Sequence, residues 1–358
     1  MINVTHYLLG SVQFSSGCPF TCEFCDIPGL YGRNPRLKRP EQIVAELDAL
    51  ADGGAVAVYF VDDNFVGNPK AAQELLPYLI QWQKRRGYNV QLSCEGTLNI
   101  GSYPKIMEMM REAGFITIFC GIETPDPNAL RAMKKTQNLR LPILDVVETL
   151  NRHGIEVASG IIMGLDTDTD GTAQAIVDFA RLSNIPIMTV NLLYALPKTP
   201  LFDRLHATGR VNSGEGRDSN VDFLRGYETV YKDWQEVVRE IYTPEAIYGR
   251  FLSNCERTYG NRWVPENPWA RLTWANVKRG IDVLSRIIWH VGIKADYRKH
   301  FWKMAWRGLK KGNLENVFHV AFIAHHLILY ARECLTGHKQ ASNYTDRNIE
   351  LVHEAAAA

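Results

Sequence analysis

Residues 17–28 have the sequence GCPFTCEFCDIP and contain three of the seven cysteines of this 358-residue chain: Cys18, Cys22 and Cys25. The triplet has the spacing C-x3-C-x2-C and directly follows a short apolar segment, Ser11–Ser16, that is expected to form a β-strand. Three thiolates can hold three irons of a [4Fe–4S] cluster, whose usual ligand set is four cysteines. The fourth iron would then stay open for a substrate or a second cofactor.

A zinc site is the alternative interpretation of this triplet, with Cys94 or Cys120 as the fourth ligand. Structural zinc sites usually combine two separated ligand pairs, so one triplet without a second pair fits poorly. An odd and unevenly spaced set of cysteines also argues against a disulfide framework. The cysteines outside the triplet are therefore not expected to be ligands: Cys94, Cys120, Cys255 and Cys334.

Outward from the cysteines, short β-branched segments alternate with amphipathic helical patterns up to about residue 200. The expected strands are Ser11–Ser16, Val56–Val61, Val90–Ser93, Ile116–Ile122, Glu156–Ile162 and Ile187–Leu193. The expected helices between them are 40–51, Ala71–Arg85, Pro104–Glu112, Ile143–Arg152 and Thr172–Leu182. Six β/α repeats in series predict a parallel sheet with right-handed crossovers, too few for a closed eight-stranded barrel. The predicted fold is α/β, a partial (β/α)6 TIM-type barrel followed by an α-helical C-terminal domain.

The composition of the sequence changes after this core. Residues 209–220, GRVNSGEGRDSN, are small and polar, and long aromatic-rich helical patterns follow them. We predict a core over 1–208, a linker loop over 209–224 and an α-helical domain over 225–350 that faces the substrate or a membrane.

Acidic or glycine-rich motifs follow the expected strands. They are Asp62-Asp63-Asn64-Phe65, Cys94-Glu95-Gly96, Gly121-Ile122-Glu123-Thr124 and the segment 160–166, GIIMGLD. Any one strand-end carboxylate is often a helix N-cap or a rim salt bridge, and a glycine often serves only the backbone. Because the carboxyl ends of parallel strands carry the active site of β/α barrels, the whole set together with the cysteines indicates a site at this edge.

The cysteine motif is similar to the signature of radical S-adenosylmethionine (SAM) enzymes, C-x3-C-x-aromatic-C, and the resemblance extends over about residues 8–205. It implies one [4Fe–4S] cluster on Cys18, Cys22 and Cys25, which cleaves SAM reductively to a 5′-deoxyadenosyl radical. The contacts to the cofactor that it implies are Phe24, Asp62, Glu95, Glu123, Gly160 and Gly164. It assigns no catalytic residue beyond the cluster.

Within that superfamily, the segments 121–138 and 164–170 look most similar to the cobalamin-dependent methyltransferase branch, and residues 242–263 resemble the extension of hopanoid C-2 methylase-like proteins. This implies methylation of an unactivated carbon on a lipid-like substrate, with electrons from a low-potential donor. The branch usually carries an N-terminal cobalamin domain with an Asp-x-His-x-x-Gly motif, which does not occur here. The chain is then a fragment, its cobalamin domain is a separate subunit, or cobalamin is not used. The alternatives are a radical SAM enzyme of another reaction, such as a cyclase, oxidation or rearrangement, and a non-catalytic metal-binding partner subunit.

Charge and hydropathy bear on the partners. The formal net charge of +1 argues against a general nucleic-acid binder. The N-terminus MINVTHYLLGS does not look like a secretory signal and no run of 18 apolar residues occurs, so we expect a cytoplasmic protein. Residues 291–311 nevertheless combine seven basic residues with aromatic residues at helical spacing, which is typical of a helix that docks on a membrane surface. A core helix with solvated charges is the alternative.

Three histidines lie in one apolar helix pattern: His319, His325 and His326. We expect them to be hydrogen-bonded packing residues, because no accompanying ligand set is visible.

Overall fold

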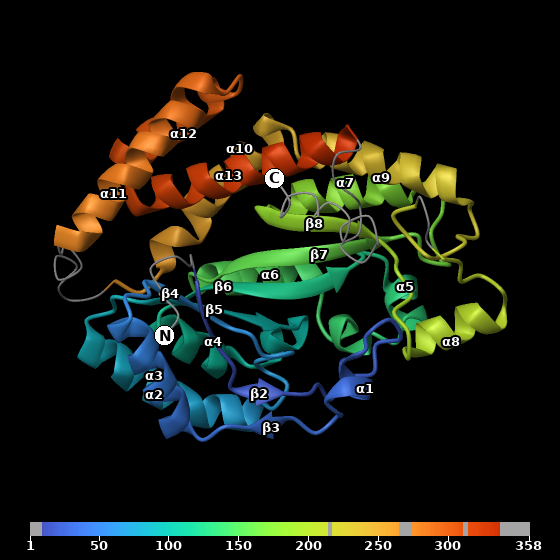
Figure 1. Ribbon diagram of the computed structural model, residues 1–358, viewed down its shortest axis with the longest axis horizontal. Coiled ribbons are helices and arrows are strands. Elements are labelled where there is room, and N and C mark those ends of the chain that lie inside the picture. The colour runs from blue at the N-terminus through green and yellow to red at the C-terminus, as the bar shows by residue number, and fades with distance from the viewer. Residues whose placement is uncertain (1–8, 214–216, 265–273, 311–313, 337–358) are drawn as a thin grey trace, which may run out of the picture.

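Residues 9–213, 217–264, 274–310 and 314–336 are described by a computed structural model of the chain. A single sheet of six parallel strands forms its centre, in the order β1-β4-β5-β6-β7-β8 (Figure 1). The strands are β1 (Gly10–Val12), β4 (Ala57–Phe60), β5 (Gln91–Gly96), β6 (Phe115–Glu123), β7 (Glu156–Met163) and β8 (Ile187–Leu192). The sequential order and the parallel pairing confirm the predicted partial barrel.

The first predicted strand is wrong in one respect, because Ser11–Ser16 is divided in two. After β1, a separate strand β2 (Ser15–Ser16) pairs antiparallel with β3 (Arg36–Leu37). The division arises because the backbone N–H groups of Phe14 and Ser15 donate to the carboxylate of Asp62 instead of to a neighbouring strand.

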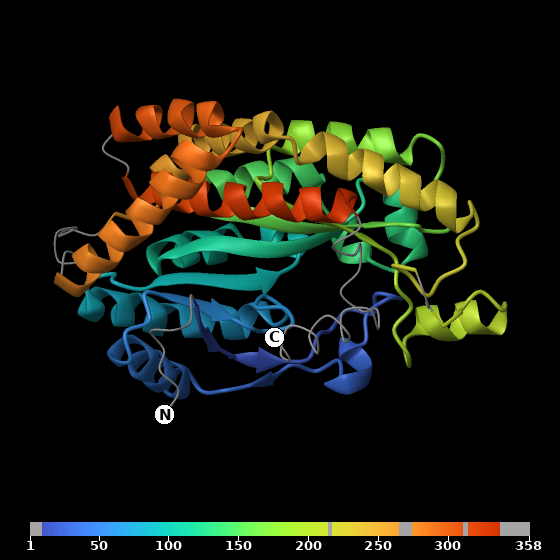
Figure 2. The same cartoon turned by 45° about the horizontal axis from the view of Figure 1, so that its top comes forward.

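Helices connect the strands and cover one face of the sheet (Figures 1 and 2). They are α2 (Pro40–Asp52), α3 (Pro69–Arg86), α4 (Pro104–Glu112), α6 (Ile143–Arg152) and α7 (Thr172–Ser183). Proline begins α2, α3 and α4, where its missing N–H costs no intrahelical bond. Shorter helices lie in the loops near the carboxyl ends of the strands, and their length left no periodic pattern to predict. These are α1 (Ile27–Leu30), η2 (Leu98–Ser102), α5 (Pro127–Ala132), η3 (Thr136–Leu139) and α8 (Pro200–Ala207).

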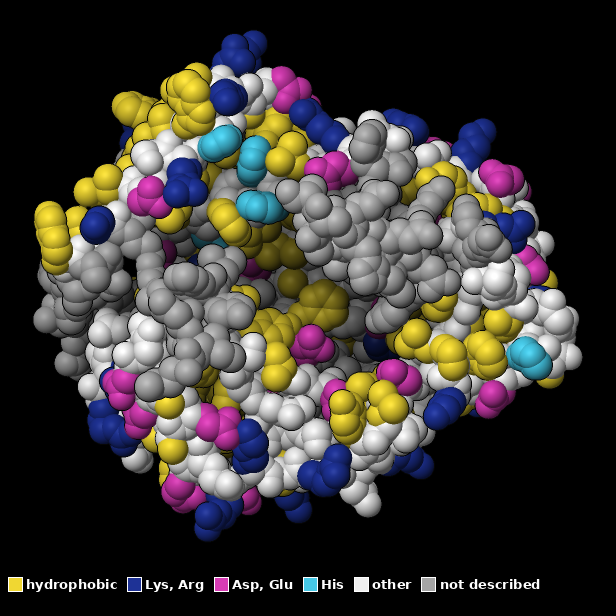
Figure 3. All heavy atoms as spheres, in the orientation of Figure 1, with side chains coloured by type: hydrophobic (Ala, Val, Ile, Leu, Met, Phe, Trp, Pro, Cys, Tyr) yellow, Lys and Arg dark blue, Asp and Glu magenta, His cyan; other side chains and the backbone are white. Residues whose placement is uncertain are grey.

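The two faces of the sheet differ in burial. In β6, Ile118, Cys120 and Ile122 point to the helices and are fully buried, whereas Phe119 and Gly121 on the opposite face are only partly buried. The same alternation occurs in β5 and β8. The inner face is therefore an open lumen, and Figure 3 shows a hollow over β6 and β7.

The C-terminal part is helical, as predicted. It comprises α9 (Tyr227–Ile241), α10 (Pro244–Arg257), η4 (Tyr259–Asn261), α11 (Trp274–Ile287), η6 (Ile288–Lys294), α12 (Arg298–Lys310) and α13 (Leu314–Leu335). Helix α9 extends the outer layer beside α7, and its Trp234 donates to the carbonyl of Val190 in β8 at 2.8 Å. Among the described helices, none is long and apolar enough to cross a bilayer.

The segment predicted as a linker is anchored to the core. Its Asn220 side chain both donates to and accepts from the backbone of Ala195 at 2.8 Å, and a β-bridge joins Val211 to Val221. The domain boundaries at 208 and 225 stay predictions.

Helix α13 is tied to the sheet through a buried carboxylate. Glu156, at the start of β7, has no exposed surface and lies 3.2 Å from His319 Nε2, while the Tyr259 hydroxyl donates to it. Burial alone would raise the pKa of Glu156, but His319, Arg262 and Tyr259 together lower it below its usual range. The other two histidines also have partners: His325 bonds to the Tyr297 hydroxyl and His326 to the carbonyl of Phe322.

Candidate active site

The loop that carries the cysteine triplet leaves the sheet after β1 and β2 and is fixed by hydrogen bonds from distant segments. Gly17 N–H donates to Asp63 at 2.6 Å, and Cys18 N–H donates to the carbonyl of Gly32 at 3.2 Å. Gly17 has φ +103°, and a Cβ there would lie 2.8 Å from the Gly32 oxygen, so a side chain is excluded. Further along, Glu23 N–H donates to the carbonyl of Met133 at 2.9 Å. The loop is therefore held in place by parts of the chain that follow α1, β4 and α5.

The three thiols lie close enough together for their charges to interact. Cys22 is buried, while Cys18 and Cys25 are half-buried. Burial is the largest cause that raises the pKa of Cys18 above its usual value, and it raises the pKa of Cys25 to about 11, with the neighbouring thiols adding to both shifts. As free thiols, Cys18 and Cys25 are therefore protonated at neutral pH, so iron binding would have to displace their protons.

Amide side chains face two of the three sulfurs. Gln137 Nε2 donates to Cys22 Sγ at 3.2 Å, and a hydrogen bond from Asn64 lowers the pKa of Cys18 against the effect of burial. The carbonyl oxygens of both amides are buried and have no hydrogen-bond partner among the described residues. Donors aimed at sulfur suit thiolate ligands, because hydrogen bonds to a ligand sulfur stabilise its negative charge.

The donor arrangement fits a cluster better than zinc. Among the described residues, no group of three or more His, Cys, Asp or Glu side chains is gathered to hold a single metal ion. Zinc needs its ligands to converge on one point, whereas in a [4Fe–4S] cluster each cysteine binds its own iron. The proposed fourth zinc ligands, Cys94 and Cys120, are fully buried in β5 and β6 on the face that the helices cover.

A buried ion pair lies beside the cysteines. Glu123, at the end of β6, is 7% exposed, and its carboxylate pairs with the ammonium of Lys135, which is 5% exposed. Burial lowers the pKa of Lys135, but Glu123, Cys22 and Cys25 outweigh it, so the net pKa is raised above the usual value. The ammonium therefore stays charged and faces both the carboxylate and the sulfurs.

The local backbone is shaped for this pair. The register of β6 against β7 shifts between Gly121 and Glu123, and Glu123 has φ +66°, which is unusual for a residue with a side chain. A Cβ at Gly121 would collide with both the Glu123 carboxylate and the Lys135 ammonium. Any larger residue at position 121 would force the carboxylate and the ammonium to move.

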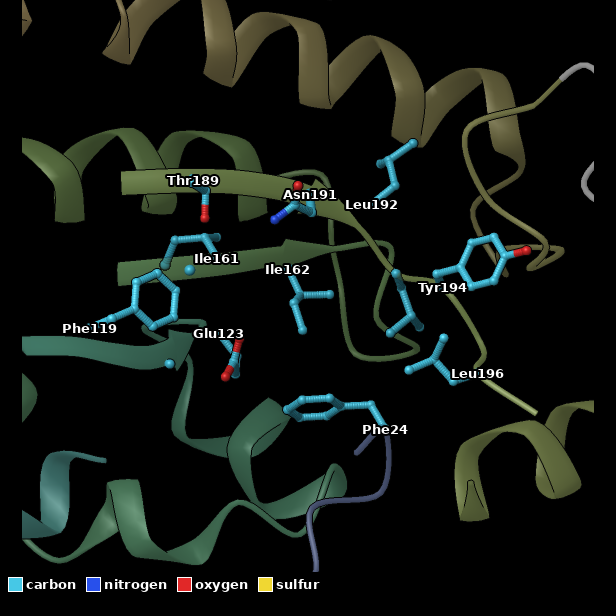
Figure 4. Close-up of a pocket in the computed structure, with 13 residues that line it drawn as sticks. Phe24, Phe119, Glu123, Ile161, Ile162, Thr189, Asn191, Leu192, Tyr194 and Leu196 are labelled. Atoms are coloured by element: carbon cyan, nitrogen blue, oxygen red, sulfur yellow. The ribbon is translucent and has the colours of Figure 1, made fainter. Parts of the chain in front are cut away.

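The lumen holds a cavity of about 270 Å³ at the same end of the sheet (Figure 4). Glu123 lies beside it, while Phe24 from the cysteine loop and Ile162 from β7 face one another across it. Thr189 and Asn191 from β8 add polar groups. The remaining lining residues are Phe119, Gly121, Gly160, Ile161, Leu192, Leu193, Tyr194 and Leu196.

Three of the predicted cofactor contacts thus come together at the cavity. Phe24 and Glu123 line it with side chains, and Gly160 lines it with backbone, where a Cβ would make only ordinary contacts. Glycine at 160 therefore enlarges the cavity without being required by the packing.

The structure places the other three predicted contacts elsewhere. Asp62 is 1% exposed and accepts from Phe14 N–H, Ser15 N–H and the Ser15 hydroxyl at 2.8, 2.7 and 2.5 Å. Burial raises its pKa to about 6 despite these bonds. The carboxylate therefore holds the approach to the cysteine loop and has little capacity left for a ligand.

Gly164 and Glu95 do not line the cavity either. Gly164 has φ +93°, and a Cβ there would collide with the Phe223 ring. Its N–H donates to Asp168 at 2.7 Å, so this glycine serves the local backbone conformation. Glu95 lies beside Asp63 and accepts a hydrogen bond from Tyr59, and burial raises its pKa.

Asn64 stands in one of the strand-end motifs, but no role was predicted for it, for Lys135 or for Gln137. The last two lie in the segment MKKTQN, residues 133–138, where a turn and the short helix η3 return the chain to the cysteines. This segment has no helical or strand periodicity that would indicate burial of either residue. The signals in the sequence were a run of polar residues between two predicted elements and the resemblance of residues 121–138 to the methyltransferase branch.

Two family models match the chain. Residues 12–180 match the radical SAM superfamily, and residues 199–340 match a domain of unknown function, DUF4070. A parallel β/α partial barrel with a cysteine triplet after its first strand and a cavity beside it defines a class of SAM-dependent radical enzymes. The chain belongs to the radical SAM superfamily, whose members use a [4Fe–4S] cluster and SAM.

The alignments with two curated relatives include most of this chain but a smaller share of each relative. The hopanoid C-2 methylase of Rhodopseudomonas palustris (strain TIE-1) is 55% identical over 97% of this chain and 66% of its own length. An uncharacterized methyltransferase of Synechocystis sp. is 34% identical over 89% of this chain and 60% of that protein. The chain therefore spans somewhat less than two thirds of the length of these relatives. The predicted resemblance to hopanoid methylases is confirmed.

Solved structures share the fold at low identity. TsrM from Kitasatospora setae, a radical SAM methyltransferase with tryptophan substrate and a SAM analogue bound, has a TM-score of 0.52 at 19% identity over 59% of this chain and 41% of that chain. OxsB, a cobalamin-dependent radical SAM enzyme with aqua-cobalamin and SAM bound, has a TM-score of 0.50 at 14% identity over 93% and 56%. These likenesses support the architecture and say nothing of the substrate.

Proposed function

We propose that this chain is the catalytic part of a radical SAM methylase that acts on an unactivated carbon of a lipid-like, hopanoid-type substrate. The observation that carries the proposal is the 55% identity to a hopanoid C-2 methylase over nearly the whole chain. The cysteine loop beside an open lumen supports the radical chemistry independently of that likeness. When bound, a reduced [4Fe–4S] cluster supplies the electron that cleaves SAM to methionine and a 5′-deoxyadenosyl radical.

The residues of the chain have distinct tasks in this proposal. Cys18, Cys22 and Cys25 hold the cluster. Glu123 accepts hydrogen bonds from donor groups of SAM at the cavity wall, and the Lys135 ammonium pairs with that carboxylate and orients it. The pair is well suited to this task because an ionised acceptor forms stronger hydrogen bonds than a neutral one.

The apolar part of the cavity has a second task. Phe24, Ile162 and Leu193 line it and limit the access of water to the reacting atoms. Exclusion of water protects a reactive intermediate from side reactions.

The test is anaerobic turnover of the reconstituted chain with SAM, a chemical reductant and a hopanoid, with and without added cobalamin. We expect 5′-deoxyadenosine in all reactions and methylated hopanoid in those that contain every methyl-transfer component. Production of 5′-deoxyadenosine with an altered but unmethylated substrate would favour another radical reaction. No SAM cleavage at all would contradict the proposal.

A lipid-like substrate requires contact with a bilayer, and the C-terminal helices offer a surface for it. Helix α12 buries Phe301 and Met304, but Trp302, Trp306 and Leu309 point outward with 45%, 63% and 47% exposure. These three follow one another at helical spacing and form a single apolar stripe. Helix α12 therefore has two apolar faces, one packed against the protein and one exposed.

A basic stripe lies directly beside the exposed aromatic one. It consists of Lys299, Lys303, Arg307 and Lys310, all of which are exposed. The last three directly follow a residue of the apolar stripe in sequence, and Lys299 lies about one turn before Trp302. The ammonium of Lys310 lies 5.3 Å from the Trp306 ring.

Large apolar side chains are also exposed on α11 and η6, the two elements before α12. Trp274 and Ile281 of α11 and Trp289 and Ile293 of η6 are all at least half exposed, and Figure 3 shows such side chains over α11 and α12. Aromatic rings flanked by cations suit the headgroup level of an anionic bilayer. We assign this surface, the α11–α12 face, to peripheral contact with lipid.

A further inference from the structure

The strip of chain directly after the cysteine loop has a surface that the radical chemistry does not use. Residues 27–40, IPGLYGRNPRLKRP, contain four cations and no acidic residue. The strip comprises α1 and β3, and within α1 no residue is buried. It runs along the lower edge of the molecule in Figure 1, on the opposite side of the cysteine loop from β7 and β8.

The strip is attached to the cysteine loop. Gly32 accepts the hydrogen bond from Cys18 N–H at 3.2 Å, and Arg33 reaches the carbonyl of Pro19 at 3.5 Å. Its strand β3 is paired with β2, which leads into the loop. A molecule that docks on the strip therefore lies beside the backbone of Cys18 and Pro19 and need not enter the lumen.

Three of its cations have no acidic partner among the described residues. Lys38 pairs with Glu46 at 2.7 Å, but Arg33, Arg36 and Arg39 are exposed and make no ion pair there. In Figure 3, Lys and Arg side chains (dark blue) lie along the lower edge over α1 and β3. The charge of these three guanidinium groups is thus available to a partner.

Exposed apolar side chains lie among the arginines. Leu30, Tyr31 and Leu37 are 61%, 45% and 45% exposed. A small apolar centre surrounded by charge is the composition of a transient interface, in which electrostatics steers the encounter and the contact area stays small. Weak electron-transfer complexes belong to this size class.

We propose that this surface, the arginine strip of residues 27–40, is the docking site for a small acidic protein that donates single electrons to the cluster. The inference rests on the proposed function, because it requires a cluster at the triplet. The transfer moves one electron: the reduced donor is oxidised by one electron, the cluster is reduced by one, and no bond forms or breaks. Donor and substrate then approach from different sides, so electron delivery does not compete with substrate binding.

The experiment compares two reductants on two charge-reversed variants. The strip variant combines Arg33→Glu, Arg36→Glu and Arg39→Glu. The control variant combines Lys105→Glu, Lys232→Glu and Arg239→Glu, three exposed cations of α4 and α9 with the same total change in charge. SAM cleavage is driven either by a bacterial flavodoxin with its NADPH-dependent reductase or by dithionite, at low and high salt.

We expect the flavodoxin-driven rate of the strip variant to fall by about tenfold or more at low salt, since steering of this kind changes association rates by 10–10³. The dithionite-driven rate and both rates of the control variant should stay within about twofold of the parent. Added salt should slow the parent with flavodoxin and shrink the difference between parent and strip variant.

Four results would overturn the inference. The flavodoxin-driven rate could be the same in parent and strip variant. The control variant could lose as much as the strip variant, which would show a general effect of charge. The dithionite-driven rate could fall equally, which would show that the strip only supports the loop. The strip variant could instead lose binding to anionic vesicles, which would assign these arginines to lipid.

Failure of the proposed function has a different signature, because the parent would then cleave no SAM with either reductant. An Arg33→Gln, Arg36→Gln, Arg39→Gln variant covers the case in which the reversed one does not fold. It should lose part of the flavodoxin-driven rate and none of the dithionite-driven rate.

Discussion

Two regions of this chain depart from ordinary burial in opposite directions. At the carboxyl ends of the strands, polar side chains are buried: Asn64, Glu123, Lys135 and Gln137 are all less than 8% exposed. On the α11–α12 face, large apolar side chains are exposed, with Trp274 at 81% and Trp306 at 63%. Buried polar groups and exposed apolar patches are the informative exceptions to the usual pattern, because each is costly without a function.

The difference separates two kinds of task. Buried amides, a carboxylate and an ammonium around three cysteines form a fixed polar environment for chemistry inside the protein. Exposed rings beside cations form a surface for something outside it. If the account is correct, substitutions in one region leave the task of the other unchanged.

The largest expected effect belongs to the cysteine triplet. Cys22→Ala should abolish SAM cleavage, because the cluster loses one of its three ligands. Cys255→Ala is the matched control, since it removes a half-buried thiol of α10 and should leave the iron content at about four per chain. Anaerobic reconstitution followed by iron, sulfide and 5′-deoxyadenosine analysis measures both. A Cys22→Ala protein with a full iron load and full cleavage would remove the triplet from the site.

The next effect concerns the α11–α12 face. Each basic residue near an anionic surface contributes about 1 kcal/mol, so reversal of Lys299, Lys303, Arg307 and Lys310 to Glu should weaken binding to anionic vesicles by at least about three orders of magnitude. Co-sedimentation with anionic and neutral vesicles measures this, and SAM cleavage should not change. The arginine-strip variant is the control and should still sediment. A parent that does not bind anionic vesicles at low salt would end the membrane proposal.

A smaller effect separates two strand-end carboxylates. Glu123→Gln should weaken SAM binding by about 1–3 kcal/mol, the cost of one charge-assisted hydrogen bond, with the cluster intact. Glu95→Gln, one strand away and outside the cavity, should leave the affinity within about twofold. Equilibrium binding of SAM to the reconstituted proteins gives both values. Equal losses would show that the cavity wall extends to β5.

The smallest effect tests how α13 is joined to the sheet. His319→Gln keeps a donor for Glu156 but removes the imidazole that helps to lower the pKa of this carboxyl, and should lower the free energy of unfolding by about 1 kcal/mol at neutral pH. The folded-state pKa of Glu156 is depressed, so its contribution is present above the unfolded value of about 4.3 and is lost as the pH falls through the folded value. The difference between parent and variant should therefore shrink on acidification below about pH 4. Denaturant unfolding at several pH values would show a constant difference if the pair contributed nothing.

The sequence was sufficient for the sheet because its signals are local. Six strands and the cysteine spacing follow from short-range pattern, and the expected strands from Val56–Val61 onward agree with the structure to within three residues. The division of Ser11–Ser16 could not be predicted, because it depends on the carboxylate of Asp62 from a later strand. The same carboxylate was expected to contact the cofactor.

The site was predictable only in part for the same reason. Phe24 and Glu123 stand in matched motifs. Lys135 and Gln137 lie near the cysteines because the chain turns back after α5, and no hydrophobic periodicity in the sequence predicts that turn. On α12 the aromatic–basic pattern was visible. Which rings are exposed depends on α10 and α13, against which the Phe301 side of the helix packs.

The central claim is that Cys18, Cys22 and Cys25 hold a [4Fe–4S] cluster with one iron open to SAM, beside the cavity of Glu123. Electron paramagnetic resonance of the anaerobically reconstituted and reduced chain, recorded with and without SAM, tests it most directly. The account predicts a [4Fe–4S] signal whose shape changes when SAM is added, and no signal in Cys22→Ala. A signal that SAM does not alter, or a chain that takes up zinc and no iron under the same conditions, would contradict it.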